Sequence, residues 1–110
     1  MEISTEELNA ISVITLTGRL DVTTASTLEK TFIQLQQKDA AKILVDCRLL
    51  EYISSAGLRV LLSAAKQTKK SSGEIALACL NANVKQVFEI SGFTSIFRIF
   101  ATKDEAISKL

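Results

Sequence analysis

The sequence predicts an α/β fold with a mostly parallel β-sheet of four to five strands and about four α-helices, in one domain spanning residues 1–110. Short apolar runs rich in β-branched residues alternate with longer segments whose apolar residues recur at helical spacing. Strands that alternate with helices are typical of parallel sheets. A chain of 110 residues can bury roughly two thirds of its unfolded surface, so it needs neither a metal nor a disulfide to fold.

The chain begins with a predicted hairpin, which makes the sheet mixed. Residues 3–8 alternate weakly between apolar and polar, Asn9-Ala10 offers a turn, and Ile11–Thr17 is rich in β-branched residues. Gly18 is expected to end the second strand, and residues 19–21 to form a loop.

The first helix is expected from about Thr24 to Lys38. Four of its apolar residues recur at helical spacing: Ala25, Leu28, Phe32 and Leu35. Thr23 or Thr24 can cap its start, and the charge of Lys38 suits the end of the helix dipole. The apolar run Lys42–Asp46 then predicts a buried parallel strand, followed by a mixed connecting segment over residues 47–53.

The second helix is expected from Ser55 or Ala56 to about Lys70. Its apolar residues share one face: Leu58, Leu61, Leu62 and Ala65. Gly73 can take the left-handed conformation that ends such a helix. The next apolar run, Glu74–Leu80, predicts another buried strand.

The last third of the chain predicts two short helices around one strand. Asn81 can cap a helix that Ser91-Gly92 closes, and a final strand lies within Phe93–Phe100. Thr102 and Glu105 have the spacing of a capping box, so a terminal helix follows. Its inward residues are expected to be Ala106, Ile107 and Leu110.

Composition excludes several kinds of function. The chain has no histidine, so it has no Ser-His-Asp or Cys-His nucleophile and no phosphohistidine. It lacks a phosphate-binding loop and a Gly-x-Gly-x-x-Gly motif, and its two cysteines are too few for the usual zinc sites. With 13 basic and 12 acidic residues, it lacks the basic excess of a nucleic-acid binder. We expect no catalysis, no cofactor, no metal and no nucleic-acid partner.

Cysteine placement and hydropathy favour a soluble cytoplasmic protein. Cys47 and Cys79 form no Cys-x-x-Cys pair, and each lies beside an apolar run. We therefore expect small buried side chains rather than redox groups. No apolar run approaches the ~20 residues of a membrane span, so no membrane insertion is expected.

Candidate functional groups lie at two junctions between strand and helix, Gly18–Asp21 and Asp46–Gly57. At the second, Ser54 and Ser55 begin a helix and small residues follow. One interpretation is structural: a serine caps the helix, and the small residues let it approach the sheet. The other is functional, because a serine at the positive end of a helix can carry a phosphoryl group without melting that helix.

Neighbouring residues allow the same two interpretations. Asp21 is a solvated cap or, if the two strands are adjacent in the sheet, a charged group near Ser55. The apolar side chains between the strand and the serines either cover the sheet edge or form an interaction surface. They are Leu49, Leu50, Tyr52 and Ile53.

The stretch DCRLLEYISSAGLRVLL, Asp46–Leu62, resembles the signature of the STAS domain family, and more narrowly the bacterial anti-sigma factor antagonists. Gly18-Arg-Leu-Asp21 is similar to the family's Gly-x-Leu-Asp motif, and NANVKQVFEISGFTSIFRIF to its third helix and last strand. The resemblance covers essentially all 110 residues. It implies the STAS fold, in which the helices pack mainly on one face of a mixed sheet.

The resemblance also implies a function and a set of site residues. Family members bind an anti-sigma factor that is also a serine kinase, which frees a sigma factor. The kinase phosphorylates the antagonist and thereby releases it, and a separate serine phosphatase resets the switch. By position, Ser55 is the expected phosphorylation site, with Ser54 as the alternative. The implied partner-binding residues are Asp21, Thr23, Thr24, Tyr52, Ile53, Ser54, Ser55, Ala56, Gly57 and Arg59.

Two departures from the family pattern concern the phosphorylation site itself. Ser54 stands where an aspartate is usual, which removes a negative charge and adds a second hydroxyl, and Ala56 stands where a serine is common. The alternative function is a STAS subunit of a transporter or stress-signalling assembly that docks without phosphorylation. A small nucleotide-binding enzyme is disfavoured by the missing motifs.

Overall fold

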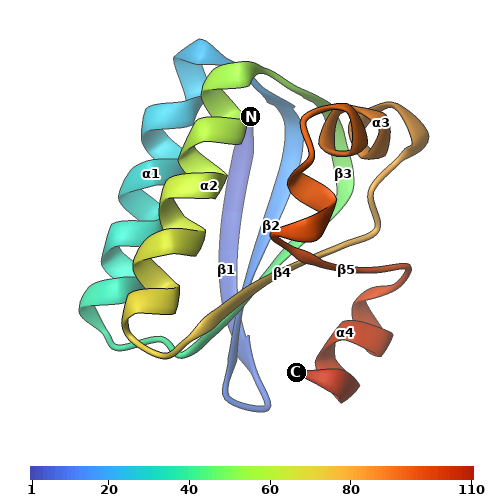
Figure 1. The fold of residues 1–110 in the computed structure, drawn as a ribbon. Helices are drawn as coiled ribbons and strands as arrows, with labels where there is room; N and C mark the ends of the chain where they lie inside the picture. The colour runs from blue at the N-terminus through green and yellow to red at the C-terminus, as the bar shows by residue number, and fades with distance from the viewer.

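The predicted hairpin forms one edge of the sheet in the computed structural model, which describes residues 1–110 (Figure 1). Strand β1 (Glu2–Leu8) pairs antiparallel with β2 (Ile11–Leu20). Asn9 and Ala10 have φ of 51° and 63°, the left-handed pair that suits the twist of a two-residue hairpin turn. Strand β2 extends beyond its predicted end, because Gly18, with φ of 101°, accommodates a change of register and the strand then continues to Leu20.

Strand β3 (Lys42–Ile53) is more than twice as long as predicted. Residues 47–53, expected as a connecting segment, continue the strand and pair in parallel with the second half of β2. Two register shifts interrupt this pairing, so buried Leu50 and Ile53 are separated by two exposed residues. A bulge breaks the two-residue alternation that identifies a strand in a sequence, which is why the prediction was wrong there.

The remaining elements follow the predicted order of alternating helices and strands. The sheet is completed by β4 (Glu74–Ala78) and β5 (Arg98–Phe100), both parallel, and its order is β1-β2-β3-β4-β5. The last strand, expected within Phe93–Phe100, is β5, and residues 93–95 form a 3₁₀ turn, η1, before it. The helices are α1 (Val22–Gln37), α2 (Ser55–Lys70), α3 (Ala82–Ile90) and α4 (Lys103–Lys109).

Three helices cover one face of the sheet and α4 lies on the other (Figure 1). The main core joins α1, α2, α3 and the turn η1 to β2, β3 and β4. A smaller cluster lies beneath α4, where Ala106 packs against Val13, Leu44, Ala76 and Phe100. The predicted α/β sheet with helices mainly on one face is therefore confirmed.

Gly73 follows the C-terminal end of α2 for a reason that differs from the predicted one. The left-handed residue is Ser72, with φ of 61°, and the C-cap of the helix is Ser71. A Cβ atom on Gly73 would lie 2.5 Å from the carbonyl oxygen of Ala41. Glycine is thus required by the close approach of two backbones.

Candidate functional site

The two candidate junctions lie side by side, because β2 and β3 are neighbouring parallel strands. Leu20 pairs with Ile53 at the carboxyl ends of these strands. The backbone N–H of Ser54 donates to the carbonyl oxygen of Leu20 at 2.8 Å. The start of α1 and the start of α2 are therefore fixed to each other at one edge of the sheet.

Asp21 is the N-cap of α1, one of the two roles expected for it, whereas Thr23 and Thr24, which were also predicted as possible caps, lie within the first turn. Its Oδ1 accepts hydrogen bonds from the backbone N–H of Thr23 at 3.0 Å and of Thr24 at 3.2 Å. Thr24 completes a capping box, since its hydroxyl accepts from the Asp21 N–H at 2.9 Å. The same hydroxyl lies 3.0 Å from the carbonyl oxygen of Arg19, to which it donates.

This cap also sets the charge of Asp21. The Thr23 hydroxyl donates to Oδ1 at 2.7 Å. That bond, with the two backbone N–H donors, lowers the pKa of the Asp21 carboxyl below its ordinary value. Asp21 therefore keeps a negative charge beside the start of α2 at neutral pH.

The two serines of the second junction have different roles. Ser54 is the N-cap of α2, and its hydroxyl accepts from the backbone N–H of Gly57 at 3.2 Å. Ser55 is the first residue of the helix; its side chain is exposed and is not used by the cap. The cap thus occupies one hydroxyl and leaves the other facing solvent.

Gly57 permits the close contact between α2 and the sheet. A Cβ atom at this position would lie 2.6 Å from Cγ of Leu20 and 3.1 Å from Cγ1 of Ile53. Both of those side chains are buried, so neither has free space into which to move. The small residue therefore sets how near Ser55 lies to the end of the sheet.

The exposed surface around these junctions includes both apolar and basic side chains. Val22 is 74% exposed and Tyr52 41% exposed. The Arg19 guanidinium lies 4.2 Å from the centre of the Tyr52 ring, a cation–π geometry. Arg59 is exposed one helical turn after Ser55.

Not every implied contact residue lies at the surface. Ile53 is 4% exposed and Gly57 is buried, and both lie beneath the serines; Ala56 is half-buried. Thr23 is exposed and Thr24 half-buried within the Asp21 cap. Val22 is not among the predicted contact residues, because an exposed apolar residue in the first turn of a helix looks the same in a sequence as a core residue.

The cysteines lie outside this site. Cys47 is 1% exposed, and burial, with a smaller contribution from Asp46, raises the pKa of its thiol strongly. Burial and Asp46 also raise the pKa of half-buried Cys79. No cluster of three cysteine, aspartate or glutamate side chains could hold a metal ion. None of the helices combines the length and hydrophobicity needed to cross a bilayer.

The family profile, described as "STAS domain", matches residues 2–106. The chain therefore belongs to the STAS domain family.

Its relatives within that family include anti-sigma factor antagonists. The protein BtrV of Bordetella bronchiseptica, assigned as an anti-sigma factor antagonist, is 36% identical over 106 residues, which are 96% of this chain and 91% of BtrV. A Thermotoga maritima structure, also assigned as an anti-sigma factor antagonist, has a TM-score of 0.92 at 23% identity, covering 97% and 92% of the two chains. The phosphorylated form of the Bacillus cell-fate determinant SpoIIAA has a TM-score of 0.79 at 22% identity, covering 98% of each.

Proposed function

We propose that this protein is an anti-sigma factor antagonist that binds an anti-sigma factor with serine kinase activity and is switched off by phosphorylation of Ser55. The observation that carries the proposal is the difference between the two serines at the start of α2. The hydroxyl of Ser54 caps the helix, whereas the hydroxyl of Ser55 faces solvent. The similarity to BtrV over 96% of the chain supports the choice of partner.

The position of Ser55 makes it a suitable acceptor for a phosphoryl group. It lies in the first turn of α2, where unpaired backbone N–H groups and the helix dipole favour negative charge. Phosphorylation transfers the terminal phosphoryl group of ATP to the Ser55 oxygen, releases ADP, and gives up the hydroxyl proton to the kinase. The helix gains a charge of about −1.5 to −2 at an end that tolerates it.

Release of the partner then follows from electrostatics at the surface rather than from unfolding. The unmodified hydroxyl can be buried against the partner at little cost. A phosphate buried there without a cation would be desolvated, and Asp21 already contributes a negative charge at the neighbouring junction. A penalty of about 3 kcal/mol weakens an association by more than a hundredfold. A serine phosphatase that removes the phosphate restores binding.

Ser54 is the less suitable acceptor. A phosphoryl group on its oxygen would have to keep or replace the hydrogen bond from the Gly57 N–H at 3.2 Å, and its side chain is half-buried. Loss of that bond would uncap α2. We therefore place the regulatory phosphate on Ser55.

The experiment that tests the function uses the native cell extract, ATP and mass spectrometry. The purified protein is incubated with the extract and ATP, and mass spectrometry then identifies the phosphorylated residue. We expect phosphate on Ser55, none in Ser55→Ala, and near-normal incorporation in the control Ser63→Ala, which changes an exposed serine in the middle of α2. Equal incorporation in Ser55→Ala would refute the assignment. A total absence of incorporation would favour a STAS docking subunit that works without phosphorylation.

A further inference from the structure

A groove with an apolar floor and a basic rim lies along the second half of α2, away from its N-terminal serines. It has a volume of about 510 Å³ and runs between α2, the start of β4 and the segment that leads from η1 into β5. Its floor is apolar and consists of Leu62, Ala65, Ile75 and Ile96. Ile96 is 49% exposed, so an apolar surface stays open to solvent here.

The groove exists because β5 is short. It pairs only with Ala76–Ala78 of β4, so the first two residues of β4, Glu74 and Ile75, pair with β3 on one side and have no strand on the other. Ser95, at the end of η1, and Ile96 line the groove together with residues of α2. The sheet edge, the helix and the turn together form the walls.

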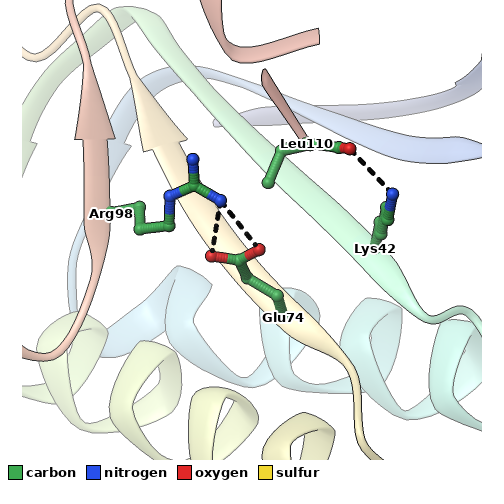
Figure 2. A network of polar contacts seen from close by, with 4 residues as sticks. All are labelled: Lys42, Glu74, Arg98 and Leu110. Atoms are coloured by element: carbon green, nitrogen blue, oxygen red, sulfur yellow. Dashed lines mark hydrogen bonds and ion pairs between the residues drawn. The ribbon is translucent and has the colours of Figure 1, made fainter. Parts of the chain in front are cut away.

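The rim of the groove is positively charged. Three basic side chains line it, Lys66, Lys69 and Arg98, against one acidic side chain, Glu74. Arg98 already neutralises Glu74 through two hydrogen bonds of 3.2 Å from one guanidinium nitrogen (Figure 2). Neither lysine has an acidic partner within 4.0 Å, so two positive charges remain uncompensated beside an apolar floor.

The helix itself contains no compensating charge. Residues 55–70 include four basic residues and no acidic one. Lys69 lies in the last turn, where it stabilises the helix dipole. That explanation does not extend to Lys66, which lies a turn earlier.

The basic rim is continuous with the surface around Ser55. Ser55, Arg59, Leu62, Lys66 and Lys69 follow one another at spacings of four and three residues, so they form one stripe along α2. At 1.5 Å per residue the stripe is about 21 Å long. The groove therefore lies at the C-terminal end of the same helix face that has Ser55 at its N-terminal end.

We propose that this groove binds an acidic segment of the partner protein, one with apolar side chains on its inner side and carboxylates toward Lys66 and Lys69. The apolar floor and the two unpaired lysines match such a segment in both respects. The inference rests on the proposed function only in assigning the segment to the anti-sigma factor. The groove and its charge are independent of any phosphorylation.

The test uses a synthetic peptide and the isotope-labelled, unphosphorylated protein. The probe is an amidated helical peptide of about 14 residues, the length of the stripe, with leucine on one face and glutamate on the other. We expect saturable NMR shifts at Leu62–Lys69, Ile75 and Ile96. Lys66→Glu combined with Lys69→Glu should weaken binding about tenfold. The matched control, Lys30→Glu with Lys85→Glu, reverses two exposed charges outside the groove and should leave affinity within about twofold.

Several results would overturn the proposal. The proposal fails if millimolar peptide gives no saturable NMR shifts, or gives them elsewhere on the surface. It also fails if a peptide with lysine in place of glutamate binds equally well, or if the control variant loses as much affinity as the Lys66 and Lys69 variant. Shifts at the groove on concentrating the protein alone would assign it to a second copy. If the protein binds vesicles that contain anionic phosphatidylglycerol but does not bind the peptide, and the Lys66 and Lys69 variant loses the vesicle binding, the groove is assigned to lipid. Because no kinase is involved, failure here is distinguishable from failure of Ser55 phosphorylation.

Discussion

Replacing Gly57 by alanine tests how closely α2 must approach the sheet. The new Cβ atom would lie 2.6 Å from Cγ and 2.8 Å from Cδ2 of Leu20, whereas ordinary contacts are 3.4–4 Å. Leu20 is fully buried, and its carbonyl oxygen accepts the hydrogen bond from the Ser54 N–H. Moving Leu20 by roughly 1 Å would therefore disturb the bond that joins the two junctions.

The magnitude follows from two opposing effects. Overpacking a close-packed core costs about 1–3 kcal/mol, and alanine recovers up to about 1 kcal/mol over glycine in a helix. We expect Gly57→Ala to lower the free energy of unfolding by about 1–2 kcal/mol, which lowers Tm by roughly 5–10 °C in a domain of this size. The measurement is urea unfolding followed by circular dichroism, supported by thermal melts.

A control and a double variant separate the contact from general effects. Ser63→Ala changes an exposed position of the same helix and should shift stability by less than about 0.5 kcal/mol. The double variant Gly57→Ala with Leu20→Ala should lose less free energy of unfolding than the two single variants lose in sum, by about 1 kcal/mol or more. Additive effects, or a Gly57→Ala variant as stable as the parent, would refute the reasoning.

Three further predictions concern the caps and the thiols. Ser54→Ala should cost about 1 kcal/mol of stability in urea unfolding, whereas Ser55→Ala should change it by less than about 0.5 kcal/mol; equal effects would contradict the assignment of the cap. The folded-state pKa of Asp21 is depressed, so its stabilisation is present above the unfolded value near 3.8 and lost as pH falls through the folded value. Urea titrations between about pH 6 and pH 2 should show a shallower acid loss in Asp21→Asn, and identical slopes would count against it. Iodoacetamide at about pH 8 should alkylate Cys47 only after unfolding, because burial raises the pKa of its thiol; rapid labelling of native Cys47, followed by mass spectrometry, would contradict this.

The sequence predicts the helices of this fold well because their signals are local. The repeat of apolar residues in α2 and the polar caps Asn81 and Thr102 identify elements from a few neighbouring residues, and the structure has them where expected. The second half of β3 gives no such signal. Its pairing with β2 passes through register shifts, which are set by the neighbouring strand and not by the segment itself.

The candidate site was predictable to a similar degree. The position of the serines at a helix start follows from their sequence context, and β2 and β3 bring Asp21 and Ser54 to the same edge of the sheet. Which residue caps each helix depends on backbone dihedral angles. Asp21 and Thr24 are both good capping residues, and only the extended φ and ψ of Asp21 decide between them.

The basic groove could not be predicted from the sequence. Its walls come from α2, the start of β4 and the segment before β5, which are separated along the chain. The lysines alone look like ordinary residues at the end of a helix. Only the packed structure shows that an exposed apolar floor lies beside them.

The order of the strands in space has a consequence for how the protein folds during synthesis. Each strand of the sheet β1-β2-β3-β4-β5 lies beside the strand that precedes it in the chain. When β2, β3, β4 or β5 leaves the ribosome, the neighbouring strand with which it first pairs has therefore already been synthesised. Such a chain can grow its sheet from one edge to the other, whereas the apolar residues beneath α4, among them Val13 and Leu44, are covered only when that last helix is made.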